Sequence, residues 1–523
     1  MLIRSTILLL ATAAVVLADT SAGCSASAPP PSTANWNGWS DAANTRFQPA
    51  RAAGLTPQST PRLKLKWAFG FPGVATAQGT PTVFGGRIFV GAADGTVYAL
   101  DARTGCTYWT YKAAAGVRGS PVVGEGGTAA YVGDLKANVY ALDVAAGKLL
   151  WKTRAEDHPM AVITGSMKLD RGKLYVPISG RDESMAATNP EYECCTFRGS
   201  VVAIDVATGK RAWTAYTVDV AKATGKNAKG TKTWGPSGAV PWSSPTLDVQ
   251  KRVLYIGTGV NYSQPATDTS DAVLAFDMDS GHLLWSRQLT AADAYNFACT
   301  GQDKTNCPTD PFIDVDFGNS GILRTLAGGK RVLVIADKGG TVYGVDPDQE
   351  GKLLWKQKVA NGGVNGGFMW GGAGDEQGVA YFGISDFNAP KPEAGGGLIA
   401  LQMSTGEKLW LTPAPKPACL GKKGCAAAQP APVTAIPGVV FLGSWDGHLR
   451  AYETGSGSRK LGAIMWDVDT AQDFKTVNGV EAHGGSINSM GPVAAGGMLY
   501  ITSGYGGNGM PGNVLLAFSV DGK

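Results

Sequence analysis

Apolar and polar residues alternate along most of the chain in short runs that are broken by glycine, proline and aspartate. The phrase VYALDARTGCTYW contains an alternating run, an acidic residue, a glycine turn and a second run that ends in tryptophan. Period-two alternation between such turn residues predicts short antiparallel strands rather than helices. The pattern therefore indicates an all-β protein.

Repetition of this phrase is the strongest signal in the sequence. Its copies end in tryptophans that we expect to pack between neighbouring sheets: Trp109, Trp151, Trp213, Trp285, Trp355 and Trp410, with a looser copy ending at Trp466. Two more strand-like runs precede most copies, as in residues 80–95 and 243–259. Each repeat thus supplies four strands, and four-stranded sheets repeated radially form a β-propeller.

The two ends of the repeat array fix the number of blades. The C-terminal phrase VLLAFSVDGK stops just after its glycine turn, and the missing outer strand, LKLKWAF, stands near the N-terminus. We expect residues 63–69 to complete the last blade and close the ring. The sequence predicts an eight-bladed β-propeller of four-stranded antiparallel blades over residues 36–523, with loops inserted at 180–197, 219–240 and 290–316. Such insertions usually lie on one face and build a site.

The N-terminal residues predict export. Residues 1–18 contain Arg4 and then the apolar run ILLLATAAVVLA, which is typical of a secretory signal peptide and too short to span a membrane. Residues 19–35 include SASAPPPSTA and indicate a flexible tether. The phrase SAGC resembles the end of a bacterial lipoprotein box, which makes Cys24 a candidate lipid attachment site. We expect a periplasmic or otherwise exported protein that meets a membrane only through such an anchor.

Export allows the cysteines to be interpreted, because disulfides persist in oxidising compartments. Two pairs bracket short polar loops and predict local bridges: Cys299 with Cys307, and Cys419 with Cys425. Cys24 and Cys106 either bond to each other or, if Cys24 carries lipid, leave Cys106 as a buried free thiol.

The remaining cysteines, Cys194 and Cys195, are adjacent. Neighbouring Cα atoms lie about 3.8 Å apart, below the usual span of a disulfide, so a bond between them requires a distorted backbone of the kind that often marks a working site. Separate partners, two free thiols or a metal pair are the alternatives. The net charge of +4 over 523 residues, without a basic cluster, argues against a nucleic-acid partner.

The repeat with its terminal tryptophan resembles that of pyrroloquinoline quinone (PQQ)-dependent alcohol dehydrogenases. The phrases CCTFRGSVVAID, NYSQPATDTSDAVLAFD, DGHLRAYE, NGVEAHGGSI and SGYGGNGMPGNVLLAFS resemble the polyvinyl alcohol dehydrogenase branch. This resemblance covers the chain from about Trp36 to its end. It implies a propeller with the quinone at its centre that oxidises alcohols, including secondary hydroxyls of a polymer. A base takes the hydroxyl proton, hydride moves to the quinone, and calcium polarises the quinone carbonyl.

The resemblance also implies which residues bind the cofactor. The family holds its planar quinone between an indole and a vicinal disulfide, and it contacts the carboxylates and carbonyls with cationic and hydroxyl side chains. The matching positions here are Trp242, the pair Cys194 and Cys195, Arg118, Lys338 and Thr164. In better-known members the cysteine pair stands one blade earlier, where this chain has Lys112 and Ala113.

The implied metal and base positions match the family less closely. Glu183, Asn261 and Asp293 are the expected calcium ligands, since calcium prefers several oxygen ligands. The family's catalytic aspartate is replaced by Asn296 in DAYNFAC, so Asp293 is the expected base. His483 in EAHGGS is an alternative base.

Two functions compete at this point. Propellers of this repeat type also act without a cofactor as binding or scaffold proteins, such as assembly lipoproteins, and a fold alone does not fix function. The vicinal cysteines, Trp242 and Lys338 favour the enzyme. The chain has no C-x-x-C-H haem attachment site, so we expect electrons to leave to a separate acceptor such as a cytochrome c.

Overall fold

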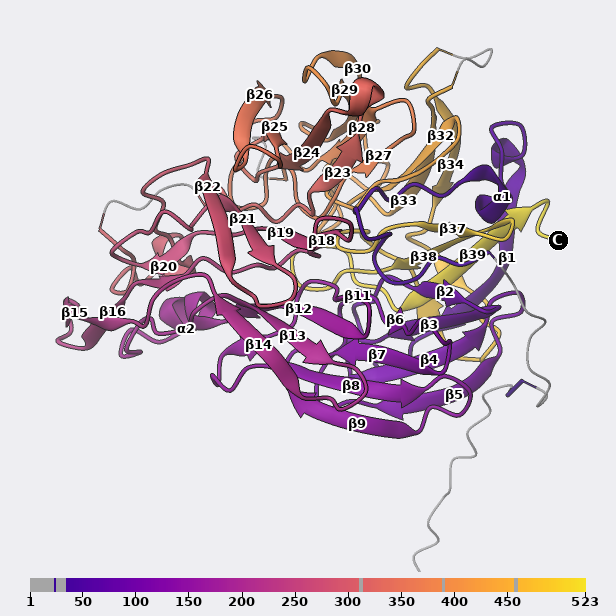
Figure 1. The fold of residues 1–523 in the computed structure, drawn as a ribbon. Coiled ribbons are helices and arrows are strands. Elements are labelled where there is room, and N and C mark those ends of the chain that lie inside the picture. The colour runs from indigo at the N-terminus through magenta and orange to yellow at the C-terminus, as the bar shows by residue number, and fades with distance from the viewer. Residues whose placement is uncertain (1–22, 25–33, 310–313, 388–390, 456–459) are drawn as a thin grey trace, which may run out of the picture.

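A computed structural model describes residues 23–24, 34–309, 314–387, 391–455 and 460–523. Its main strands form eight antiparallel sheets arranged as the blades of a propeller, as the sequence predicted (Figure 1). The predicted signal peptide and residues 19–22 and 25–33 of the predicted tether lie outside the described residues. Among the described residues, no helix is both long and apolar enough to cross a membrane.

Each blade runs from an innermost strand at the hub to an outermost strand at the rim. The first four blades contain β2 (Thr82–Phe84), β3 (Arg87–Gly91), β4 (Thr96–Asp101) and β5 (Thr107–Lys112); β6 (Val122–Val123), β7 (Ala129–Gly133), β8 (Asn138–Asp143) and β9 (Leu149–Arg154); β10 (Ala161–Val162), β11 (Lys168–Asp170), β12 (Lys173–Gly180), β13 (Ser200–Asp205) and β14 (Arg211–Tyr216); and β18 (Thr246–Asp248), β19 (Val253–Gly257), β21 (Ala272–Asp277) and β22 (Leu283–Gln288).

The last four blades follow the same order. They contain β23 (Ile322–Thr325), β24 (Arg331–Ala336), β25 (Thr341–Asp346) and β26 (Lys352–Lys358); β27 (Ala373–Gly374), β28 (Val379–Ile384), β29 (Gly397–Gln402) and β30 (Lys408–Pro413); β31 (Thr434–Ile436), β32 (Val439–Gly443), β33 (His448–Glu453) and β34 (Ile464–Asp469); and β37 (Val493–Ala495), β38 (Met498–Ser503), β39 (Val514–Val520) and β1 (Leu63–Gly70).

Short elements lie outside the blades. These are β15 (Lys222–Lys226), β16 (Lys232–Gly235), β17 (Ser237–Gly238), β20 (Asn261–Ser263), β35 (Asp473–Phe474) and β36 (Ala482–His483), the helices α1 (Ala50–Ala53) and α2 (Asp182–Thr188), and the 3₁₀ turns η1 (Thr60–Arg62), η2 (Phe297–Cys299) and η3 (Ala327–Gly329). Several of them belong to the long insertions, and α2, β15, β16 and β20 gather on one side of the ring in Figure 1.

The ring closes as the sequence predicted. Strand β1 pairs antiparallel with β39, from Leu63 opposite Val520 to Gly70 opposite Val514. Because β1 comes from the start of the propeller and β39 from its end, the eighth blade joins the two ends of the array.

The repeat tryptophans connect neighbouring blades. The indole of Trp109 in the first blade donates to the carbonyl of Val144 in the second, and the indole of Trp466 in the seventh donates to Leu63 in the eighth. Gly147, at φ +68°, lies so close to the ring of Trp109 that a Cβ atom there would be 2.5 Å from it. The conserved spacing of tryptophan and glycine within this chain thus reflects blade-to-blade packing.

A segment that the sequence did not predict circles the hub. We call residues 36–48 the N-terminal belt, and it bonds to the innermost strand of each blade in chain order. The contacts join Trp36 to Val83, Asn37 to Val123, Ser40 and Asp41 to Lys168, Ala42 to Leu247, Ala43 to Leu323, Thr45 to Gly374, Arg46 to Ala435, and Gln48 to Ala494.

The belt also closes one end of the hub. Trp39 packs against Met369 and Trp370, with Trp242 beside them. Arg46 is 1% exposed, and its guanidinium donates to the carbonyls of Trp39, Val433 and Pro492 and to the hydroxyl of Thr434. The belt therefore both joins the eight blades to one another and closes one end of the hub, which we call the floor.

The belt makes stability depend on pH through Lys168. Burial lowers the pKa of Lys168 to about 7, although the charge of Asp41 opposes the shift. The unfolded chain holds this proton up to its ordinary pKa of 10.5, so between about pH 7 and 9 the unfolded state binds more protons. We expect the free energy of unfolding to rise with pH in this range, by at most about 1.4 kcal/mol per pH unit.

Chemical denaturation at pH 7, 8 and 9 measures this slope. The Lys168→Met variant lacks the titrating group and should lose this part of the slope. An equal slope in both proteins would show that Lys168 does not cause it.

Three predicted or alternative disulfides form in the structure. Cys299 bonds to Cys307 and Cys419 to Cys425, as expected for the two short loops. Cys24 bonds to Cys106, which is one of the two alternatives for that pair. A sulfur in this bond is not available to carry a lipid, so the structure does not support an anchor at Cys24.

Candidate active site

A cavity of about 470 Å³ occupies the hub. Residues from six blades line it, among them Arg118, Thr164, Glu183, Trp242 and Lys338. All five are residues that the sequence marked as candidates for binding a cofactor or metal. The hub is therefore open to a ligand above the floor that the belt provides.

Trp242 lies in the wall of this cavity and is held on several sides. Its ring meets that of Trp370 edge to face, with centroids 5.0 Å apart and an interplanar angle of 81°. Its Nε1 donates to Oδ2 of Asp316 at 3.1 Å. A Cβ atom on Gly318 would lie 1.8 Å from the indole, so only glycine leaves room for the ring in this position.

Lys338 forms a buried ion cluster beside the indole. Its ammonium donates to Asp314 at 2.7 Å and to Asp316 at 2.9 Å, and it lies 5.7 Å from the centroid of the Trp242 ring. Burial alone would lower the pKa of Lys338, but the two carboxylates raise it above its ordinary value. Lys338 is therefore a permanent cation at the cavity wall.

Asp314 and Asp316 differ in their position within the cluster. Burial raises the pKa of Asp314 to about 8, against the opposing charge of Lys338. Asp316 lines the cavity, and Oδ1 of its carboxylate accepts a hydrogen bond from the backbone N–H of Val260 at 2.8 Å. With Lys338 and Trp242 as further donors, Asp316 is a fixed carboxylate at the cavity wall.

Arg118 and Thr164 line the cavity with polar groups. The Arg118 guanidinium lies 4.4 Å over the ring of Trp370, and its Nη2 donates to the hydroxyl of Tyr505 at 3.3 Å. Its buried Nε has no hydrogen-bond partner among the described residues. Thr164 accepts a hydrogen bond from Ser179 at 2.8 Å. An anionic ligand would satisfy the Nε donor.

Glu183 brings a second acidic side chain to the cavity from the first turn of α2. Burial, followed by the charges of Asp314 and Asp316, raises the pKa of Glu183 well above its ordinary value. Among the described residues, Glu183 and Asp316 are the carboxylates that line the cavity, beside the cations Arg118, Arg181 and Lys338.

The structure does not bring Asn261 or Asp293 to the cavity wall. Asn261 is fully buried, where its amide donates to Ser237 and accepts from the backbone N–H of Thr267 at 2.7 Å. Asp293 is also fully buried and accepts from the N–H of Val315, and burial raises its pKa to about 6. Neither side chain lines the cavity, so the cavity lining gives no support to the metal and base roles expected of them.

His483 lies outside the cavity as well. Its Nδ1 pairs with Asp473 at 2.7 Å, and about half of its side chain is exposed. Asp316, which the sequence analysis missed, is the aspartate that does line the cavity. An available signal was the phrase DVDFG, where Asp316 precedes the aromatic Phe317 at the end of the longest insertion.

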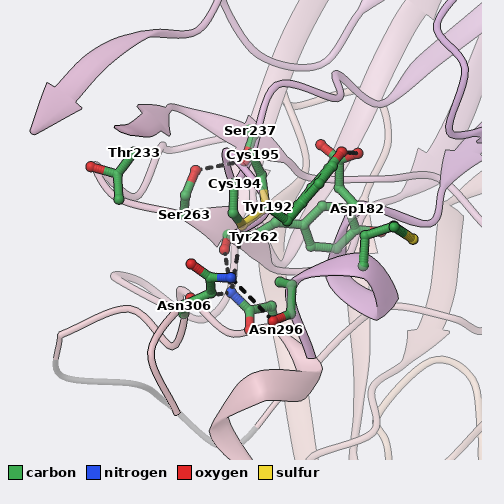
Figure 2. The surroundings of a disulfide bond; sticks show 12 residues. Asp182, Tyr192, Cys194, Cys195, Thr233, Ser237, Tyr262, Ser263, Asn296 and Asn306 are labelled. Atoms are coloured by element: carbon green, nitrogen blue, oxygen red, sulfur yellow. Dashed lines mark hydrogen bonds between the residues drawn. A yellow bond between two sulfur atoms is a disulfide. The ribbon is translucent and has the colours of Figure 1, made fainter. Parts of the chain in front are cut away.

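The vicinal cysteines form a disulfide, as the resemblance implied, and Figure 2 shows them near Tyr262. Cys194 is 3% exposed and Cys195 is fully buried, and both belong to an apolar cluster that includes Tyr262. Tyr262 lines the cavity, whereas neither cysteine is among the described residues that do. The contact of the disulfide with the quinone face stays a prediction, and Tyr262 is the residue of this cluster that lines the cavity.

Comparisons with known proteins agree with this fold and hub. A family model described as outer membrane protein assembly factor BamB matches residues 62–228 and 338–475, and one described as glucose/ethanol/alcohol dehydrogenase, beta-propeller domain, matches residues 183–303. The solved structure of the quinohemoprotein alcohol dehydrogenase ADHIIG from Pseudomonas putida HK5 covers 94% of this chain and 81% of its own at a TM-score of 0.70 and 20% identity. A europium-containing methanol dehydrogenase covers 92% and 98% at a TM-score of 0.67 and 19% identity.

Two curated relatives are more similar in sequence. A polyvinylalcohol dehydrogenase of a Pseudomonas species is 41% identical over 93% of this chain and 77% of its own length. A second polyvinylalcohol dehydrogenase, from a Sphingopyxis species, has the same identity and coverage.

The eight blades and the relatives define a quinoprotein dehydrogenase. The chain belongs to the family of PQQ-dependent alcohol dehydrogenases, in its polyvinyl alcohol dehydrogenase branch.

Proposed function

We propose that this exported protein oxidises secondary hydroxyl groups, including those of polyvinyl alcohol, with PQQ in the hub cavity and calcium beside it. Electrons pass to a separate acceptor such as a cytochrome c in the periplasm. One observation supports the proposal most strongly. The indole of Trp242, the ammonium of Lys338 and the carboxylate of Asp316 contact one another at one wall of the cavity.

The described residues fit the quinone. Trp242 offers an apolar ring held rigid by Trp370 and Gly318. Arg118 has a buried donor without a protein partner, and Lys338 supplies a second cation, which suits the carboxylates and carbonyls of PQQ. When bound, PQQ supplies the acceptor for hydride.

The same wall fits a hard cation. Glu183 and Asp316 line the cavity, and with Asp314 they place three carboxylates near one ammonium. Calcium prefers oxygen ligands, some of them anionic, so Glu183 and Asp316 would hold it. When bound, the ion supplies polarisation of a carbonyl oxygen.

We assign the role of general base to Asp316. Hydrogen bonds from Lys338, Trp242 and the N–H of Val260 hold this carboxylate at the cavity wall, where it can take the proton of a substrate hydroxyl. The same bonds fix the direction in which its oxygens point, which sets where the hydroxyl must lie.

Replacing Asp316 with asparagine should lower kcat about 10²- to 10⁴-fold, the usual contribution of a positioned base. Asp293→Asn is the matched comparison, because Asp293 is buried away from the cavity and should keep kcat within about tenfold. Steady-state dye reduction with PQQ-loaded protein measures both. A greater loss in Asp293→Asn than in Asp316→Asn would reverse the assignment.

Turnover tests the function itself. Purified protein mixed with PQQ and calcium should reduce an artificial electron acceptor when given 2-propanol or polyvinyl alcohol. No binding of PQQ would leave the cofactor-free scaffold as the better description, and binding of PQQ without turnover of any alcohol would contradict the proposed reaction.

A further inference from the structure

Three insertions form a cap at one side of the hub. They contribute α2 and the loop to Cys195, the hairpin β15–β16, and the loop that contains η2 and the disulfide from Cys299 to Cys307. We call these segments the insertion cap, and Figure 1 shows α2, β15 and β16 together at the same edge of the propeller.

Asparagine side chains hold the parts of the insertion cap together. Asn306 donates to the carbonyls of Ala186 at 3.2 Å and Asn189 at 3.0 Å, which join the η2 loop to α2 and its end. Asn227, between β15 and β16, donates to the side chain of Asn306 at 2.9 Å. The cap is therefore one bonded unit.

Phe297 brings an aromatic side chain from this cap to the cavity, which Glu183 of α2 also lines. It lines the cavity, yet 37% of the residue is exposed. Most other large apolar residues of comparable exposure stand on outermost strands, such as Leu150 on β9 and Leu284 on β22, far from the hub in the order of strands. Single exposed apolar residues are common on protein surfaces, but this one borders the proposed substrate site.

Asn296 fixes the direction of Phe297. Its Nδ2 donates to the carbonyl of Tyr262 at 3.0 Å and to that of Asn306 at 2.8 Å, while its Oδ1 accepts from the N–H of Ala298 at 2.9 Å. Figure 2 shows Asn296 between Tyr262 and Asn306, next to the vicinal disulfide. Asn296 stands where the family's base was expected. These three hydrogen bonds hold the backbone beside Phe297 in place.

We infer that Phe297 is a specificity-determining residue that covers the carbon chain of the alcohol while its hydroxyl lies at Asp316. The inference rests on the proposed function and names the residue that favours secondary alcohols with an extended apolar chain over short ones. Val364 also lines the cavity and extends the apolar surface that such a chain would meet. Methylene groups removed from water against these side chains stabilise the complex in proportion to the area buried.

The Phe297→Ala variant tests the inference through the ratio of kcat/KM for a long alcohol to kcat/KM for a short one. We measure kcat/KM for 2-octanol and for 2-propanol with PQQ-loaded enzyme, and we expect their ratio to fall about tenfold, as when roughly half of a phenyl contact is lost. Phe297→Leu should recover part of the loss, since leucine restores an apolar contact. Leu150→Ala, which removes an exposed apolar residue from the outer strand β9, should leave the ratio unchanged.

A binding measurement without turnover separates the two proposals. The change in tryptophan fluorescence when 2-octanol is titrated into protein without PQQ should show weaker binding in Phe297→Ala than in the wild type. A wild-type protein that oxidises no alcohol would contradict the proposed function. Equal binding of 2-octanol by the wild type and by Phe297→Ala would overturn the role of Phe297. An active enzyme whose ratio does not change in Phe297→Ala would overturn it as well.

Discussion

Replacement of Gly318 by alanine is expected to abolish the retention of PQQ, although it changes no polar group. The added Cβ atom would lie 1.8 Å from the indole of Trp242 and must displace it. The displaced ring would lose its edge-to-face contact with Trp370 and its hydrogen bond to Asp316. Because a planar ligand needs this ring as a fixed surface, we expect PQQ affinity to fall at least 100-fold.

Equilibrium dialysis against PQQ measures this effect. Gly126→Ala is the matched control, because the nearest atom to a Cβ at that position is 3.8 Å away, and its affinity should equal that of the wild type. Tight binding of PQQ by Gly318→Ala would mean that the position of the indole does not matter to the cofactor.

Replacement of Arg46 by methionine should destabilise the whole propeller. Methionine leaves the carbonyls of Trp39 and Val433 without this donor in a site that is 1% exposed, and it removes the donor to Thr434, whose hydroxyl still donates to the carbonyl of Pro492. Each buried acceptor that loses its partner costs about 1–3 kcal/mol, so we expect a loss of at least about 2 kcal/mol. The Arg46 side chain then no longer joins Trp39 of the belt to the seventh and eighth blades.

The midpoint of urea unfolding measures the loss. Arg51→Met, at an exposed position next to the belt, should change the free energy of unfolding by less than about 0.5 kcal/mol. If Arg46→Met unfolded at the same urea concentration as Arg51→Met, the belt would not stabilise the ring.

The fold was predictable because each blade repeats one local pattern. Period-two alternation gives the strands, the terminal tryptophan marks the outermost strand, and the truncated last copy shows that β1 must complete it. The belt was not predictable in this way. Its residues have no strand period, since they bond to eight different strands one after another rather than to one neighbour.

The candidate site was predictable where it is built on the repeat and not where it is built on an insertion. Trp242 stands just before β18, the innermost strand of the fourth blade, and Lys338 stands in the turn between β24 and β25 of the fifth, and both line the cavity. Asp293 and Asp316 lie in one long insertion, where no period relates position in the chain to position in space. Asp316 lines the cavity and Asp293 does not, a difference that their positions in the chain do not reveal.

The vicinal disulfide shows a further limit of the sequence. Adjacent cysteines indicate that a bond between them can form, but they do not say which surface it faces. Here Tyr262 stands at the cavity wall and the disulfide packs with it in the same apolar cluster. Only the packing of three insertions determines that order.

Titration of the purified protein with PQQ, followed by the quenching of tryptophan fluorescence, tests most directly whether the hub is a quinone site. Trp242 and Trp370 both border the cavity, so we predict saturable quenching with one PQQ bound per chain. Quenching that grows without saturation, or the absence of bound PQQ after dialysis, would contradict a quinone site in this hub.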